Sequence, residues 1–166
     1  MMYGVDYFPE PDAYNFGKKL IKIPGLDGTG KMGKSEGNGI FLADTPDEIR
    51  RKVMKAVTDA GPKEPGETPS EPVKNLFTIM KVVSDPSTVK YFTEKHSSCE
   101  IRYGEMKKQL AEDIIKVTEP IRLRINEILA DSKYMAKVVS EGSEKARASA
   151  SKTIRDVREI IGYRAF

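Results

Sequence analysis

From residue 45 onward, one pattern repeats along the chain: apolar residues recur every three or four positions. This spacing places apolar side chains on one face of an α-helix. It predicts helices over about 46–60, 73–83, 85–92, 106–129 and 133–163. Because no strand pattern separates them, we expect an all-α fold, a helical bundle.

Local residues sharpen the predicted boundaries. Thr45 with Glu48 forms a capping-box pattern, and Asp85 before a proline is a second helix start. Pro120 lies inside the fourth pattern, where we expect a kink or a brief break. The last helix is expected to bury a single stripe made of Met135, Val139, Ala146, Ala150, Ile154, Val157 and Ile161.

The first part of the chain differs from the rest. Residues 1–43 are rich in glycine, proline and aromatic residues, and only 19–23 has the composition of a short strand. Residues 60–72 contain four prolines and three glutamates, which predicts an exposed, mobile connector. We therefore expect an irregular segment over 1–43 and a helical domain over 44–166.

Composition limits the chemistry. The chain has 28 basic and 25 acidic residues, so its charge alone points to no nucleic-acid partner. It has no long apolar run and no signal-peptide pattern at its start, so we expect a cytoplasmic protein without a membrane contact. Cys99 has no second cysteine to pair with, and His96 is the single histidine. We expect no metal site, and we expect His96 at a polar helical or loop-edge position.

The stretch from Gly28 to Ser35 fits the phosphate-loop pattern, with two glycines separated by four residues and followed by Lys34 and Ser35. Such a loop needs a buried strand before it and a helix that starts at the lysine. Here proline ends the strand candidate early, and two glycines after Ser35 oppose a helix. What remains is a glycine-flanked loop with Lys31 and Lys34, which can gather around phosphates and neutralise developing charge.

The sequence segments in and after this loop resemble those of a known family. "KMGKS" (31–35) is similar to the lysine signature of class I aminoacyl-tRNA synthetases, with Gly33 in place of a serine. The following residues 36–59 resemble bacterial tryptophanyl-tRNA synthetases, which have an asparagine after the signature and a capped helix that ends in Thr-Asp. Four later segments resemble that family's helical carboxy-terminal region, in order: 75–80, 103–114, 120–131 and 141–157.

The resemblance implies a parent enzyme that forms tryptophanyl-adenylate from tryptophan, ATP and Mg²⁺ and then charges its cognate tRNA. Lys34 and Lys31 would contact the phosphates as pyrophosphate leaves, Lys34 above all. Met32 would anchor the loop, and Gly33, Ser35 and nearby amides would complete the phosphate site. The helical region would be the anticodon-binding-type domain.

The sequence also departs from that family. The His-x-Gly-His signature is absent, as is most of the nucleotide-binding sheet, so the chain resembles a carboxy-terminal portion that starts at the end of the catalytic domain. We expect this chain alone to be inactive. The parent is expected to be a homodimer, and the oligomeric state of this chain stays open.

The last helix gives a separate indication of RNA binding. Opposite its apolar stripe lie basic residues, namely Lys145, Arg147, Lys152, Arg155 and Arg158. A solvated helix face with Glu144, Asp156 and Glu159 is the competing interpretation. Three alternatives to a tryptophanyl-type synthetase portion stay open: a tyrosyl-type synthetase fragment, a non-enzymatic RNA-binding helical module and a phosphate-loop nucleotidase.

Overall fold

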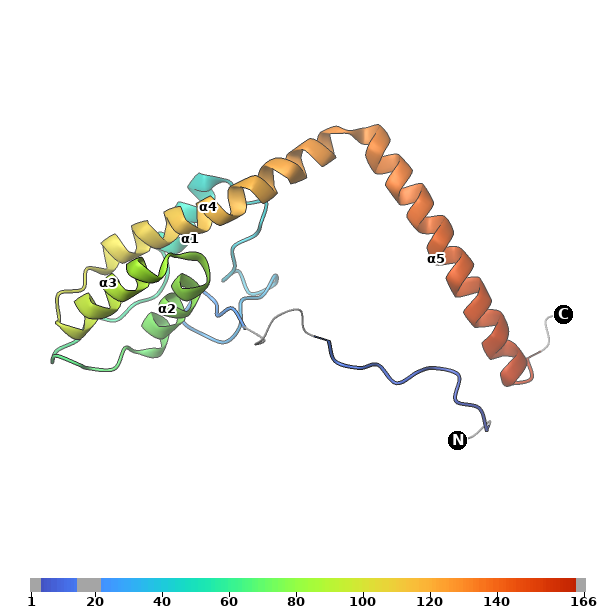
Figure 1. Ribbon diagram of the computed structural model, residues 1–166, viewed down its shortest axis with the longest axis horizontal. Helices are drawn as coiled ribbons and strands as arrows, with labels where there is room; N and C mark the ends of the chain where they lie inside the picture. Colours follow the sequence, from blue (N-terminus) through green and yellow to red (C-terminus); the bar gives the residue numbers. More distant parts are fainter. Residues whose placement is uncertain (1–3, 15–21, 164–166) are drawn as a thin grey trace. The chain divides into compact units, whose positions relative to one another are not determined.

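The computed structural model describes residues 4–14 and 22–163. These residues form five α-helices and no strand, in the order shown in Figure 1. The helices are α1 (Pro46–Met54), α2 (Glu71–Val83), α3 (Pro86–Ser97), α4 (Tyr103–Ala130) and α5 (Ser132–Ile160). The predicted all-α class is confirmed. Of the strand predicted over 19–23, residues 19–21 lie outside the described part, and Lys22 and Ile23 form no strand.

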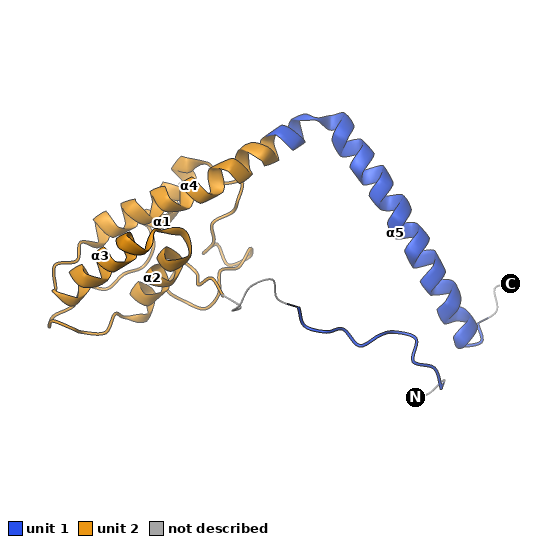
Figure 2. Cartoon of the chain, viewed as in Figure 1, with its two compact units in different colours: residues 1–20, 127–166 blue, residues 21–126 orange. Residues whose placement is uncertain are grey.

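The chain divides into two compact units, which Figure 2 shows in different colours. One unit contains residues 21–126, and we call it the core unit. The other contains residues 1–20 and 127–166, and we call it the terminal unit. The predicted domain boundary near residue 43 stays a prediction.

The core unit has one hydrophobic core to which all four of its helices contribute. The most deeply buried side chains come from α1, α2 and α4, and they are Ile49, Val53, Val73, Leu76, Met80, Met106 and Leu110. Phe92 adds the contribution of α3, and Leu26 brings in the segment that precedes α1. Each buried aliphatic side chain of this size contributes about 1.5–3 kcal/mol, so this core fixes the position of the residues around Leu26.

α1 starts where the sequence predicts. The Thr45 hydroxyl accepts the N–H of Glu48 at 3.3 Å, and the Glu48 carboxylate accepts the N–H of Thr45 at 2.8 Å. The helix ends at Met54, however, and not near residue 60. The N–H of Val57 instead donates to the Leu26 carbonyl at 3.0 Å, a tertiary bond that the local pattern does not encode. Val57, which follows Ile49 and Val53 at helical spacing within the predicted 46–60 helix, is 45% exposed.

α3 is longer than predicted and includes His96. Asp85 is its N-cap residue, as expected, although its side chain makes no capping hydrogen bond. His96 lies on a helix, but it is buried and not at a polar, loop-edge position. The prediction was wrong because only tertiary packing on α2 brings this last turn into the core.

α4 continues through Pro120 without a break. The proline removes the hydrogen bond to the carbonyl of Lys116, and Lys116 is exposed to water. The buried face of α4 ends at Thr118. Three apolar residues that continue the predicted helical spacing over 106–129 are therefore exposed: Val117, Ile121 and Leu129.

The terminal unit contains α5, which has no buried residue. Met135 and Val157 of the predicted stripe are half-buried, and the other five members are exposed, so the expected burial was wrong for this chain. The periodicity shows which side of a helix is apolar but not what covers it. Within this unit, the Tyr7 hydroxyl donates to the Asp156 carboxylate at 2.9 Å, and this bond raises the pKa of Tyr7.

Hydrogen bonds tie the predicted connector 60–72 to the core unit. The N–H of Gly66 donates to the Ser97 carbonyl at 2.9 Å, and the Ser70 hydroxyl donates to the Asp59 carboxylate. Asp59 also accepts the Tyr103 hydroxyl at 2.7 Å. The connector forms no helix or strand, and its mobility stays a prediction. No helix in the described part of the chain is long and apolar enough to cross a bilayer.

Candidate functional site

The lysine-bearing segment 22–44 folds as a tight turn with two arms. The arms meet at an isolated bridge between Pro24 and Lys31, where the N–H of Met32 donates to the Ile23 carbonyl at 2.9 Å. Gly28, at the turn, has a φ of 80°, and a Cβ there would come within 2.8 Å of Pro72 in α2. Glycine at this position therefore lets the turn lie close to the helical core.

Asn38 is the buried polar residue that holds this segment together. Its side-chain oxygen accepts the N–H of Gly33 at 3.0 Å, and its amide nitrogen donates to the Asp27 carboxylate at 3.1 Å. The same nitrogen lies 3.4 Å from the carbonyl of Lys31. Asn38 is only 6% exposed, and a Cβ on Gly25 would lie 2.3 Å from its amide nitrogen. One side chain thus fixes the backbone on both sides of Met32.

Asp27 completes this network. Its carboxylate accepts the hydroxyl and the N–H of Thr29, at 2.8 and 3.1 Å. These bonds, together with the bond from Asn38, keep the pKa of Asp27 below its ordinary value. The aspartate therefore stays ionised while it supports Asn38. Neither Asp27 nor Asn38 was singled out as functional from the sequence; Asn38 entered only as part of a family resemblance, and no pattern pointed to Asp27.

The two lysines project from this frame into solvent. Lys31 and Lys34 are both exposed, and neither forms an ion pair with any residue of 4–14 or 22–163. Met32 between them is half-buried, and its sulfur accepts the N–H of Ile40 at 3.4 Å. Two ammonium groups without an ion-pair partner, on a backbone held in place by the Asn38 side chain, can act together on an anion.

Gly33 and Ser35 lie between and beside these lysines. Gly33 has no positive φ, so its backbone conformation is one that serine can also adopt. A Cβ there would come within 2.7 Å of Glu36 Cγ, the atom of a flexible, exposed side chain that can move. The Ser35 hydroxyl is exposed and lies 3.4 Å from the Glu36 carboxylate.

A hollow of about 650 Å³ adjoins both lysines. Its lining is mainly apolar and includes Ile23, Met32, Ile40, Phe41 and Ile125 beside the two lysines. Such a surface can receive a flat apolar group while the ammonium groups meet an adjoining anion. The described residues contain no group of three His, Cys, Asp or Glu side chains that could hold a metal ion.

The phosphate-loop alternative lacks its structural context. In the described segment from Lys22 to Thr45, no strand leads into Gly28 and no helix starts at Lys34. The first helix begins only at Pro46. Lys34 and Ser35 therefore have no helix dipole behind them, which a Walker loop requires.

The predicted RNA-contacting residues lie on α5, in the terminal unit. Lys145, Lys152, Arg155 and Arg158 are all exposed. Arg158 lies over the Tyr163 ring at 5.4 Å. Within the described residues, none of these four forms an ion pair, including with Glu144, Asp156 or Glu159.

Removing the Asn38 amide should loosen the loop. We expect Asn38→Ala to lower the free energy of unfolding by about 1–3 kcal/mol, because it leaves the N–H of Gly33 without its acceptor and removes one of the three hydrogen bonds to the Asp27 carboxylate. Hydrogen exchange should show faster exchange at Gly33, and denaturant titration should give the stability. Ser35→Ala is the control and should change neither quantity. Unchanged exchange at Gly33 in Asn38→Ala would contradict this role.

Comparisons with known proteins agree on one family. Residues 8–119 match the family described as tRNA synthetases class I (W and Y). The chain is 53% identical over 163 residues to a tryptophan–tRNA ligase from Porphyromonas gingivalis, an alignment that covers 98% of this chain and 50% of that protein. It is 36% identical over 169 residues to the tryptophan–tRNA ligase of Clostridium longisporum, covering 99% and 49%.

A solved structure supports the same relationship. The fold is similar to the tryptophanyl-tRNA synthetase from Campylobacter jejuni complexed with ADP and tryptophan, with a TM-score of 0.68 and 25% identity. That match covers 88% of this chain and 45% of the other. The chain thus spans about half the length of the curated relatives it matches.

Proposed function

Because the chain belongs to the class I tRNA synthetase family of the tryptophan and tyrosine enzymes, we propose that it works as part of a tryptophanyl-tRNA synthetase. The whole enzyme would activate tryptophan with ATP and transfer it to its cognate tRNA. One observation carries this proposal. Lys31 and Lys34 are both exposed and form no ion pair with the described residues, and the loop that bears them is held by hydrogen bonds of the Asn38 side chain. The tryptophan enzyme is preferred over the tyrosine enzyme because of the 53% identity to a tryptophan–tRNA ligase.

In this proposal Lys34 and Lys31 are the catalytic residues of the segment. Their ammonium groups would contact the ATP phosphates and offset the negative charge that grows as pyrophosphate leaves. Met32, Gly33 and Ser35 would complete the phosphate site. Mg²⁺ would be bound mainly through the phosphates of the nucleotide, as is usual for this ion.

The exposed basic face of α5 is proposed to follow the tRNA backbone. Its four residues Lys145, Lys152, Arg155 and Arg158 have no acidic partner within the described residues, which favours a phosphate-facing role over a solvated, internally paired face. The protein would act in the cytoplasm, where tRNA is charged, and the whole enzyme would be a homodimer. The non-enzymatic RNA-binding module remains the second candidate, since the same basic face would serve it.

The direct test compares the chain with a chimera, in which residues 1–166 replace the matching half of the Porphyromonas gingivalis ligase. We expect the chimera to catalyse tryptophan-dependent exchange between ATP and pyrophosphate. The isolated chain should show no exchange above background, because the two lysines act only in a closed, desolvated site. An inactive but folded chimera would count against the proposal and favour the non-enzymatic module. Exchange by the isolated chain would contradict its expected inactivity.

Neutralising the basic face should weaken tRNA binding. In the chimera, Lys152, Arg155 and Arg158 are together replaced by glutamine, which removes three positive charges. We expect the slope of log affinity against log salt to become shallower by roughly 2–3, depending on whether the contacts are to single or paired strands. The control replaces Lys90, Lys108 and Lys116, three exposed lysines outside α5. Equal slopes for the two triple variants would reject the α5 contact.

A further inference from the structure

A second candidate site surrounds the single histidine. His96 is only 4% exposed, and within the described residues no group forms a hydrogen bond with its imidazole. Its ring contact is with Phe77, edge to face, with the centroids 6.2 Å apart. Each imidazole nitrogen is a donor or an acceptor, and neither is among the fully enclosed, unpartnered side-chain atoms of the described residues, so both are reachable from solvent. This histidine therefore has unused hydrogen-bonding capacity.

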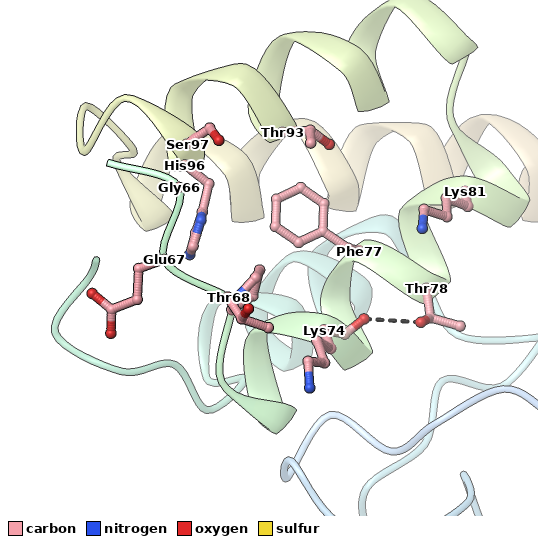
Figure 3. A pocket seen from close by; sticks show the side chains of 11 residues that line it. Gly66, Glu67, Thr68, Lys74, Phe77, Thr78, Lys81, Thr93, His96 and Ser97 are labelled. Atoms are coloured by element: carbon pink, nitrogen blue, oxygen red, sulfur yellow. Dashed lines mark hydrogen bonds between the residues drawn. The ribbon is translucent and has the colours of Figure 1, made fainter. Parts of the chain in front are cut away.

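The imidazole lines a hollow of about 500 Å³ in the core unit, shown in Figure 3. The walls are α2, α3 and residues 66–69 of the connector. The bond from Gly66 to the Ser97 carbonyl holds the connector against the end of α3. The hollow shares no lining residue with the one beside Lys31 and Lys34. Its volume lies within the range of small-ligand sites.

Charge at this hollow is mainly positive. Lys74 and Lys81 lie two helical turns apart on α2, and both line it. Lys81 forms no ion pair with the described residues, and Lys74 pairs only with the exposed Glu71, at 3.2 Å. The one carboxylate in the lining, Glu67, accepts the N–H of Lys63 at 2.6 Å. Figure 3 shows it directed away from Phe77. Two lysines in the lining favour an anionic ligand such as a phosphate.

The lining also offers a buried aromatic ring and, nearer to solvent, two hydroxyl oxygens. Phe77 is 7% exposed, and its ring is part of the lining. The Thr78 hydroxyl donates to the Lys74 carbonyl at 2.9 Å, and the Thr93 hydroxyl donates to the Val89 carbonyl at 2.7 Å. With their protons used, both hydroxyls present only acceptor oxygens. An aromatic ring beside acceptors and an imidazole suits a flat heterocycle that has N–H donors.

We propose that this hollow binds one nucleoside phosphate unit, with the base against Phe77 and His96 and the phosphate at Lys74 and Lys81. The preference for a nucleotide over another phosphorylated ligand rests on the function proposed above. The unit can be a free mononucleotide or one unstacked residue of a single RNA strand. Both present the same base and phosphate to the protein.

The single histidine makes a direct test with this chain. Its imidazole proton resonances need no assignment among others, so they report the hollow alone. The probes are AMP, CMP, inorganic phosphate, a short single-stranded RNA of mixed sequence, and the same RNA without bases. We expect the His96 resonances to move with AMP, CMP or the intact RNA, and to move much less with inorganic phosphate or the abasic strand.

Two variants test the phosphate contact and the base contact separately. Joint replacement of Lys74 and Lys81 by alanine should make the salt dependence of RNA binding shallower by about 1.4 in slope, as expected for two contacts to a single strand. The control replaces Lys90 and Lys108 by alanine, which removes the same charge from exposed positions outside the hollow. Phe77→Leu should weaken binding by roughly fivefold or more, because the stacking surface is lost.

These measurements on the isolated chain test whether the hollow binds a nucleotide. If the His96 resonances shift with the mononucleotides but not with RNA, the ligand of the hollow is a free nucleotide. If they shift with RNA but not with the mononucleotides, the ligand is an RNA strand. Unmoved His96 resonances at saturating concentrations of every probe overturn the proposal, as do equal salt slopes for the two double variants. Equal shifts with inorganic phosphate and with nucleotide overturn the role of the base. None of these measurements depends on tryptophan activation, so an inactive chimera and an empty hollow are distinguishable.

Discussion

Replacing Lys34 by alanine in the chimera should lower the rate constant of tryptophan-dependent pyrophosphate exchange by roughly a hundred- to a thousandfold. This is the usual effect of removing one group that stabilises charge only in the transition state. The Lys34 ammonium makes no ion pair within the described residues. Its loss should therefore leave the fold intact and act on catalysis alone.

The kinetic pattern distinguishes this role from simple binding. We expect kcat to fall while the KM for tryptophan changes little, because the lysine would act on the phosphates and not on the amino acid. Lys22→Ala is the matched control, since Lys22 is an exposed lysine that lines the same hollow. We expect it to retain most of the activity. Equal losses in the two variants, or a change confined to the KM for tryptophan, would contradict the assignment.

Gly33 need not weaken this chemistry. The N–H of Gly33 is already held by the Asn38 side chain at 3.0 Å, so the backbone between the lysines is fixed without a hydroxyl at this position. Asn38 is in turn held by Asp27, whose carboxylate stays ionised because its pKa is lowered. We infer that the hydrogen bonds of the buried Asn38 side chain stabilise the loop, whichever residue lies between the lysines.

Features encoded by adjacent residues could be predicted from the sequence. The capping box of Thr45 and Glu48 and the helix start at Asp85 depend on contacts within a few residues, and both are present. The lysine-bearing loop was also located, since its glycines and lysines lie together in the chain. These features need no knowledge of the rest of the fold.

Features that depend on distant contacts could not be predicted. The end of α1 is set by a bond from Val57 to Leu26, and the burial of His96 is set by packing against Phe77. The role of Asn38 needs Asp27 and Gly33 brought together by the turn. Each of these partners is separated along the chain, and no periodicity connects them.

The buried face of α4 extends as far as Thr118, whereas α5 has no buried residue, and this difference predicts a second large effect, on stability. Leu110 of α4 is fully buried, whereas Ile154 of α5 is 48% exposed, although both occupy the apolar stripes of amphipathic helices. Leu110→Ala should lower the free energy of unfolding of the chain by about 2–5 kcal/mol, because it removes buried methyl groups and leaves a cavity. Ile154→Ala should change it by less than about 0.5 kcal/mol.

Denaturant titration of the isolated chain, followed by circular dichroism, would measure both values. The pair is informative because each substitution shortens a branched aliphatic side chain to alanine on a long helix, so helix propensity favours both variants slightly. A difference in stability must then come from burial. If Ile154→Ala cost as much as Leu110→Ala, the stripe of α5 would be covered in solution, and the exposure of Val139, Ile154 and Ile161 would have to be reinterpreted. A small cost for Leu110→Ala would instead contradict the core described for α1, α2 and α4.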